Sequence, residues 1–153
     1  MRTLAWLVVV IAALALAAAV HAQGYGGYDY STPTGASALS EALKTAQSHA
    51  TFAAQAESMA GVRQHLAHVV NCLQGPRGSN FNAQAGNPCQ GQGNGIIPDL
   101  TARGAQGAKA LAKAREANTA ALDALKIAAL TQAKAGATKV ATLLTESMKE
   151  LPQ

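Results

Sequence analysis

The chain has 153 residues, of which 4% are aromatic, and a formal net charge of +4. This mild charge is spread along the chain and few rings are present to stack on bases, so we do not expect nucleic acid binding. The length is enough for one domain with its own core, and leaves no room for a second.

The N-terminus has the pattern of a secretory signal peptide. Arg2 gives the positive charge, residues 4–20 form an unbroken apolar run, and Val20 and Ala22 stand at positions −3 and −1 of a cleavage site. We expect cleavage after Ala22, export to the periplasm or the medium, and no stable membrane insertion afterwards. Because a run of 17 residues is close to the shortest that spans a bilayer, an uncleaved anchor is the alternative.

Residues 23–36, QGYGGYDYSTPTGA, contain three tyrosines and four glycines without a helical period. They are interpreted as a flexible leader. The folded domain is therefore expected over residues 37–153.

The rest of the chain predicts four helices and no strand. Apolar residues recur at helical spacing, and glycines are interpreted as helix stops at Ala60-Gly61 and at Gly136. The expected helices cover residues 37–59, 62–73, 108–134 and 137–150. In the third helix the expected buried stripe is Leu111, Leu122, Leu125 and Ala129, with a kink at Asn118-Thr119.

A segment rich in glycine and asparagine, residues 74–97, separates the second and third helices. Structureless loops of this length are rare in compact domains unless something holds them. Cys72 and Cys89 are the two cysteines of an exported chain, so we expect a disulfide that pins the loop to the second helix; metal-bound thiolates are the alternative. Phe81 is expected to insert into the core. The predicted fold is an all-α, up-down four-helix bundle of two hairpins with this loop between them.

His65 and His68 lie three residues apart on the second helix and share one face. Paired imidazoles at this spacing suit copper, zinc, nickel or iron, or a non-covalently bound haem. A hairpin that turns at Ala60-Gly61 would place His49 level with Cys72. This position disfavours a triad of His49, His65 and His68. His49 is kept as an additional candidate ligand. A site of neutral imidazoles should lose metal below about pH 6. The alternative is structural: histidines that donate to backbone carbonyls of the loop.

The stretch HLAHVVNCL, followed by GNPCQGQGNG, resembles a group of small exported bacterial helical proteins that share H-x-x-H-x-x-N-C-L and N-P-C-x-G-x-G-N-G. The resemblance covers residues 65–99 and implies export without implying a particular activity. The predicted architecture is more loosely similar to periplasmic four-helix proteins that carry haem or metal. Unlike those with covalent haem, this chain has no C-x-x-C-H motif.

Two functions are compatible with these features. The first is an exported protein that binds a transition metal or haem near the histidine pair. The second is a non-catalytic envelope protein whose loop contacts a protein partner. A homodimer is compatible with both. No G-x-S-x-G or similar catalytic setting is present, so we do not expect an enzyme.

Overall fold

The computed structural model describes residues 35–152, and all regular structure among them is helical. The five α-helices are α1 (Gly35–Gln55), α2 (Met59–Gln74), α3 (Ile96–Ala102), α4 (Ala108–Lys126) and α5 (Leu130–Lys149). Short 3₁₀ turns cover Ala83–Ala85 and Gly104–Gly107. The predicted all-α class is confirmed, with α3 as an additional short helix. The predicted signal peptide and residues 23–34 of the leader lie outside the described residues.

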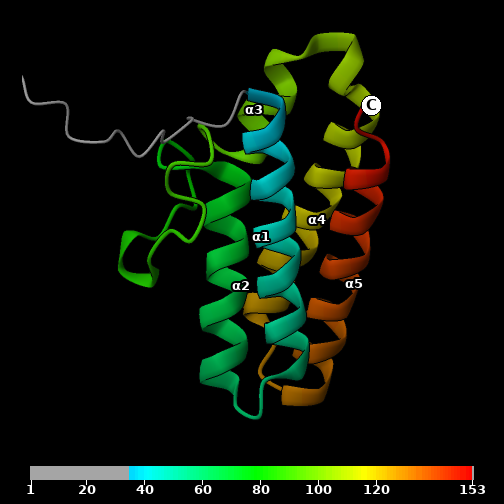
Figure 1. The fold of residues 1–153 in the computed structure, drawn as a ribbon. Coiled ribbons are helices and arrows are strands. Elements are labelled where there is room, and N and C mark those ends of the chain that lie inside the picture. The colour runs from blue at the N-terminus through cyan, green and yellow to red at the C-terminus, as the bar shows by residue number, and fades with distance from the viewer. Residues whose placement is uncertain (1–34, 153) are drawn as a thin grey trace, which may run out of the picture. The chain divides into compact units, whose positions relative to one another are not determined.

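The long helices α1, α2, α4 and α5 pack side by side in a helical bundle (Figure 1). The α1 helix contacts both α2 and α5, and α4 contacts both α5 and α2. The short α3 helix packs on α4 and α2. The loop after α2 lies beside that helix, at the end of the bundle where α3 begins (Figure 1).

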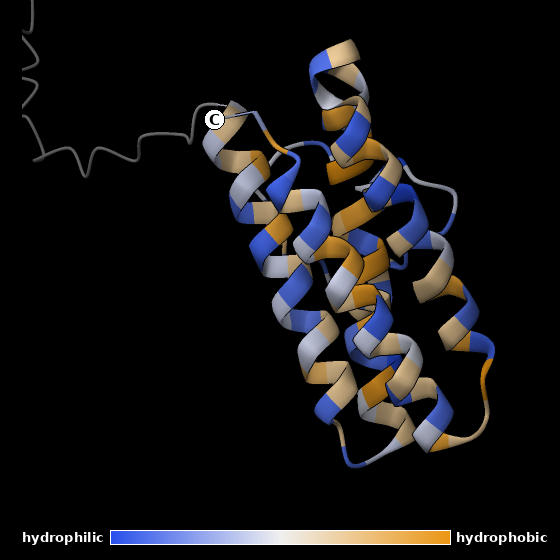
Figure 2. Cartoon of the chain, turned by 90° about the vertical axis from the view of Figure 1, so that its right-hand side faces the viewer, coloured by the Kyte–Doolittle hydropathy of each residue, from blue (hydrophilic) through white to orange (hydrophobic). Residues whose placement is uncertain are grey.

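Alanine forms much of the core, so the helices approach one another closely. The buried hydrophobic residues come from all of the long helices, and Figure 2 shows hydrophobic and hydrophilic residues alternating along each of them. On α4 the buried positions are Ala110, Ala114, Ala117, Ala121 and Ala124. The predicted stripe is therefore not the fully buried face of this helix: Leu111, Leu122 and Leu125 are partly buried, pack against the core and flank the alanine seam, and Ala129 is exposed beyond the end of the helix. Within the described residues, no helix is long and apolar enough to cross a bilayer.

The turn between α1 and α2 lies earlier in the chain than predicted. Ser58 has an extended backbone, with φ −138° and ψ 153°, and its hydroxyl accepts a hydrogen bond from the Gly61 amide. An N-cap of this kind starts a helix, so α2 begins directly after Ser58, whereas α1 has already ended at Gln55. Gly61 is therefore inside α2, where a Cβ would lie 3.2 Å from that of Ala56. Gly61 was predicted to stop a helix. In the structure its small size instead allows the chain to pack closely at the turn.

The same correction applies to the second hairpin. The reversal occurs over residues 127–129, whereas Gly136 is inside α5. A Cβ on Gly136 would lie 2.8 Å from the Cβ of Ala124, so this glycine allows α5 to approach α4 next to the turn. The α4 helix is continuous through the predicted kink at Asn118.

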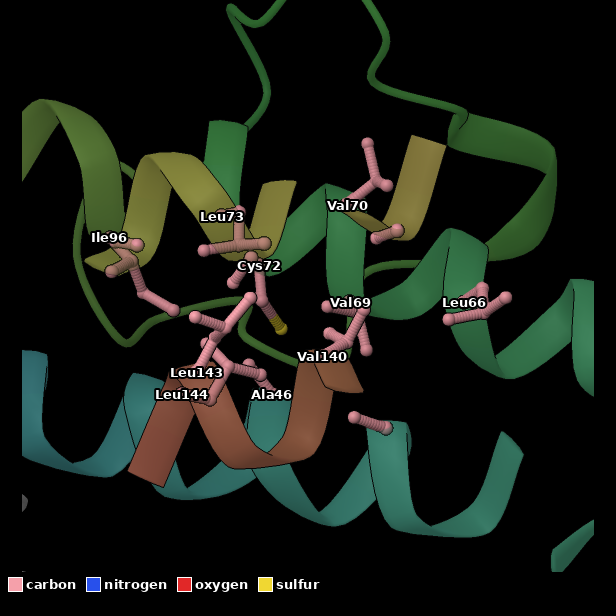
Figure 3. Close-up of a cluster of buried hydrophobic side chains, with 14 of the residues drawn as sticks. Ala46, Leu66, Val69, Val70, Cys72, Leu73, Ile96, Val140, Leu143 and Leu144 are labelled. Atoms are coloured by element: carbon pink, nitrogen blue, oxygen red, sulfur yellow. The ribbon is translucent and has the colours of Figure 1, made fainter. Parts of the chain in front are cut away.

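The disulfide between Cys72 and Cys89 is present, as predicted. Both cysteines are buried, and Figure 3 shows Cys72 among apolar side chains of several helices. Ile96, at the start of α3, is fully buried there. Phe81 was wrongly expected in the core: it is half-buried and outside the hydrophobic cluster, and Ile96 fills the interior at this end.

The two ends of the loop meet backbone to backbone. Gly75 and Gly95 both have positive φ, at 67° and 122°. A Cβ on Gly75 would lie 1.7 Å from the Asn94 carbonyl oxygen, and one on Gly95 would lie 2.6 Å from the Gly75 nitrogen. Only glycine fits both the conformation and the space.

Candidate metal centre

Three histidine side chains from two helices converge on one point. The Nδ1 atom of His49, on α1, lies 3.1 Å from Nδ1 of His65 and 3.2 Å from Nδ1 of His68, both on α2. One ring nitrogen from each residue lies within 4.8 Å of the other two. All three side chains are half-buried. The structure thus brings together His49, His65 and His68, a triad that the hairpin predicted from the sequence had disfavoured.

The position of the turn explains the difference. With Ala56 to Ser58 as the connection, the hairpin centres on Glu57, and His49 and His65 are each eight residues from it. They therefore lie level across the hairpin, and His68 is one turn further along the same face of α2. The predicted turn was about four residues too late, which moved the position facing His49 by seven residues, from His65 to Cys72, or roughly 10 Å along the axis.

His68 is oriented by the loop through its second nitrogen. Its Nε2 atom forms a hydrogen bond with the carbonyl oxygen of Ala85. A carbonyl can only accept, so Nε2 carries the proton and Nδ1 of the neutral ring presents a lone pair. A backbone acceptor on the outer nitrogen is a common arrangement around metal-bound histidine. This bond also agrees with the alternative prediction that the histidines donate to backbone carbonyls of the loop. It uses only Nε2, however, which faces away from the cluster and leaves Nδ1 available.

Asn71 holds the loop in place under His68. Its side chain is fully buried, and Nδ2 donates to the carbonyl oxygens of Asn82 and Gly86, at 2.7 and 2.6 Å. Its Oδ1 accepts from the Asn82 amide at 2.8 Å. These three bonds bracket Ala85, so the acceptor of His68 is fixed by the side chain one turn further along α2.

The sequence reasoning gave Asn71 no role. The available signal was its spacing: His65, His68, Asn71 and Cys72 lie at i, i+3, i+6 and i+7 on one face of α2. A polar side chain between a histidine pair and a disulfide, next to a long loop, is well placed to bind that loop's backbone. The motif H-x-x-H-x-x-N-C thus combines two cluster histidines, a loop-binding amide and the disulfide.

The cluster disfavours protonation of its members. Burial, together with repulsion from His68 and His65, lowers the pKa of His49 from 6.5 to about 4. Burial, followed by repulsion from His68, also lowers the pKa of His65. His49 is therefore neutral at pH 5, where an ordinary histidine is largely protonated. This extends below pH 6 the range in which His49 presents a lone pair.

The nitrogen spacing suits one small cation. Two nitrogens that each lie about 2.05 Å from an ion, and 3.1 to 3.2 Å from each other, subtend about 100° at it. This angle is close to the tetrahedral value. Within residues 35–152, no carboxylate or thiolate joins the group, and both cysteines are in the disulfide. Of the three candidates from the sequence, the structure brings together all three and adds no fourth.

We expect the metal-free protein to lose stability between pH 6.5 and about 4 because of His49. The unfolded state binds a proton in this range and the folded state does not, so the free energy of unfolding falls as the pH falls. Since solvent screens a half-buried ring, the loss should be about 1 kcal/mol. Denaturant unfolding of wild type and His49→Gln at pH 7 and pH 4.5 measures it. Parallel pH dependence in the two proteins would contradict the assignment.

Comparison with known proteins gives no relative on which to base a function: no family model, no curated protein and no solved structure matches the chain. The resemblance of the histidine and N-P-C motifs to exported bacterial proteins stays a prediction. The function is therefore inferred from the geometry of the cluster.

Proposed function

We propose that the protein binds one divalent transition metal ion through Nδ1 of His49, His65 and His68. The observation that carries the proposal is the convergence of the three Nδ1 atoms, with the outer nitrogen of His68 already bonded to Ala85. Without a metal, a proton on one of these nitrogens can be shared in a hydrogen bond; a bound cation would take its place and accept a lone pair from each of the three rings. Imidazole suits zinc, copper, nickel and iron, and the near-tetrahedral angle favours zinc among them.

The geometry favours a single ion over haem. Two histidines that bind haem iron from opposite faces place their nitrogens about 4 Å apart, on either side of the porphyrin. Here the nitrogens lie 3.1 and 3.2 Å apart, with rings from three residues around the same point. A porphyrin plane does not fit between them.

The proposal also covers where and how the protein acts. We place it in the periplasm or outside the cell, from the signal-peptide pattern, as a binding protein and not an enzyme. We interpret the domain as an up-down four-helix bundle in which the disulfide-pinned loop supports one metal ligand. Its partners would be an envelope protein or a second copy of the chain.

The rival function, a structural envelope protein with the loop as contact surface, explains less of the site. It accounts for the bond from His68 to Ala85. For His49 it offers a hydrogen bond from one ring nitrogen to another, which explains one close Nδ1 pair but does not call for a third Nδ1 atom within 3.2 Å. Metal binding accounts for both.

Titration of the mature protein with Zn²⁺ in a calorimeter tests the proposal. We expect one ion per chain, and each of His49→Ala, His65→Ala and His68→Ala should weaken binding by more than about 100-fold, beyond the usual effect of outer-shell changes. Gln64→Ala, at an exposed position beside His65, is the matched control and should bind as wild type does. Unchanged affinity in all three histidine variants, or no binding by wild type of Zn²⁺, Cu²⁺, Ni²⁺ or Fe²⁺, would reject the function.

A further inference from the structure

The histidine cluster supplies three ligands, whereas a zinc-like ion takes four. A structural zinc site normally closes all four positions with protein side chains, and a site with three protein ligands keeps one position for an external molecule. Within the described residues the group ends at His49, His65 and His68. The fourth position is therefore available to a molecule from solution.

The charge of the site selects the kind of molecule. Three neutral imidazoles leave the full charge of a divalent ion uncompensated. Within residues 35–152, no carboxylate oxygen belongs to the group of ligand atoms that lie within 4.8 Å of one another, so none compensates that charge at the site. A monodentate anion supplies both the missing ligand atom and the missing negative charge.

One aromatic side chain lines the cluster on the side away from the loop. The loop contacts the cluster at His68, whereas the ring of Phe52 lies 5.6 Å from that of His49, edge to face, and 5.5 Å from that of His65. Phe52 is 49% exposed, the large hydrophobic side chain that the described part of the chain leaves in solvent. An exposed ring next to an open metal position forms an apolar wall for the body of a ligand.

We propose that the metal bound at this site takes a small organic anion as its fourth ligand, with the anion's apolar body against Phe52. This inference rests on the proposed metal binding. The anionic group binds the ion, and the apolar part determines which anions bind well. Carboxylates with an aromatic or branched body meet both requirements.

Cobalt is a suitable probe, because Co²⁺ replaces Zn²⁺ and its visible spectrum reports the coordination number. Azide added to the Co²⁺-loaded protein should shift the visible bands in a saturable manner. Benzoate should bind about fivefold more tightly than acetate, a difference of the size of one aromatic contact. In Phe52→Ala the azide shift should persist and the preference for benzoate should disappear.

Each of the other results that these experiments could give would overturn a different part of the two proposals. If Co²⁺ binds and its spectrum does not respond to any of the three anions, the fourth position is closed and this inference is wrong, while the proposed metal binding stands. Metal-dependent dimerisation without an azide response would mean that a second copy fills the position. A benzoate preference retained in Phe52→Ala would remove the role of that ring. Failure to bind Co²⁺ and Zn²⁺ at all rejects the proposed function itself.

Discussion

Replacing Asn71 by aspartate should lower the free energy of unfolding by about 4 kcal/mol, the range found when a buried charge loses its partners. The substitution keeps the shape of the side chain and removes both N–H donors. It directs a carboxylate at the carbonyl oxygens of Asn82 and Gly86, which now repel it. Denaturant unfolding of the metal-free protein measures the change. Zinc affinity should also fall by about 10- to 100-fold, because the carbonyl that orients His68 is no longer held.

Asn80→Asp is the matched control for this prediction. It introduces the same charge into the same loop, at an exposed position where the side chain donates to Ser79. Its effect should stay within about 0.5 kcal/mol, the usual range for surface substitutions. Equal destabilisation by the two variants would show that added charge, and not the loss of the three bonds of Asn71, is responsible.

Removing the disulfide should cost about 3 kcal/mol of stability. Cys72 and Cys89 are 17 residues apart, and closing a loop of that size removes roughly this much conformational entropy from the unfolded chain. The Cys72→Ala, Cys89→Ala double variant avoids burying unpaired hydroxyls and should unfold at a correspondingly lower denaturant concentration. The alanine-rich core provides less apolar area than a leucine core, so the disulfide is a large share of the total stability.

The disulfide prediction has an internal control, because wild type can be unfolded in the presence and absence of a thiol reductant. Reduced wild type and the double variant should have similar stabilities, both below that of the oxidised protein. Oxidised and reduced wild type with the same unfolding midpoint would contradict the prediction.

The all-helical class and the disulfide could be predicted from the sequence because each depends on a strong local signal. Helical spacing of apolar residues needs no knowledge of partners, and two cysteines have only one possible pairing within the chain. The ends of the helices depended on weaker signals. Gly61 and Gly136 resemble helix stops in sequence, but the structure uses both as small residues inside helices, at contacts with Ala56 and Ala124.

Which histidines make up the candidate metal centre depended on those same helix ends. The Ser58 cap sets the turn, and the turn decides whether His49 reaches His65. Moving the turn by about four residues along the chain changes the predicted site from a pair of histidines to a triad. The role of Asn71 depended on the path of a loop without periodic pattern, which sequence spacing alone does not determine.

The meeting of Gly75 and Gly95 closes the intervening segment into a ring, which the disulfide and the bonds of His68 and Asn71 also hold against α2. Length added at an exposed position between these contacts need not displace α2 or α3. Gly91, where a side chain would meet nothing within 4 Å, lies in such a position beyond Cys89. Foreign peptide inserted there should be carried by the domain as a display site, while the anchored part around Asn82 to Gly86 keeps its geometry.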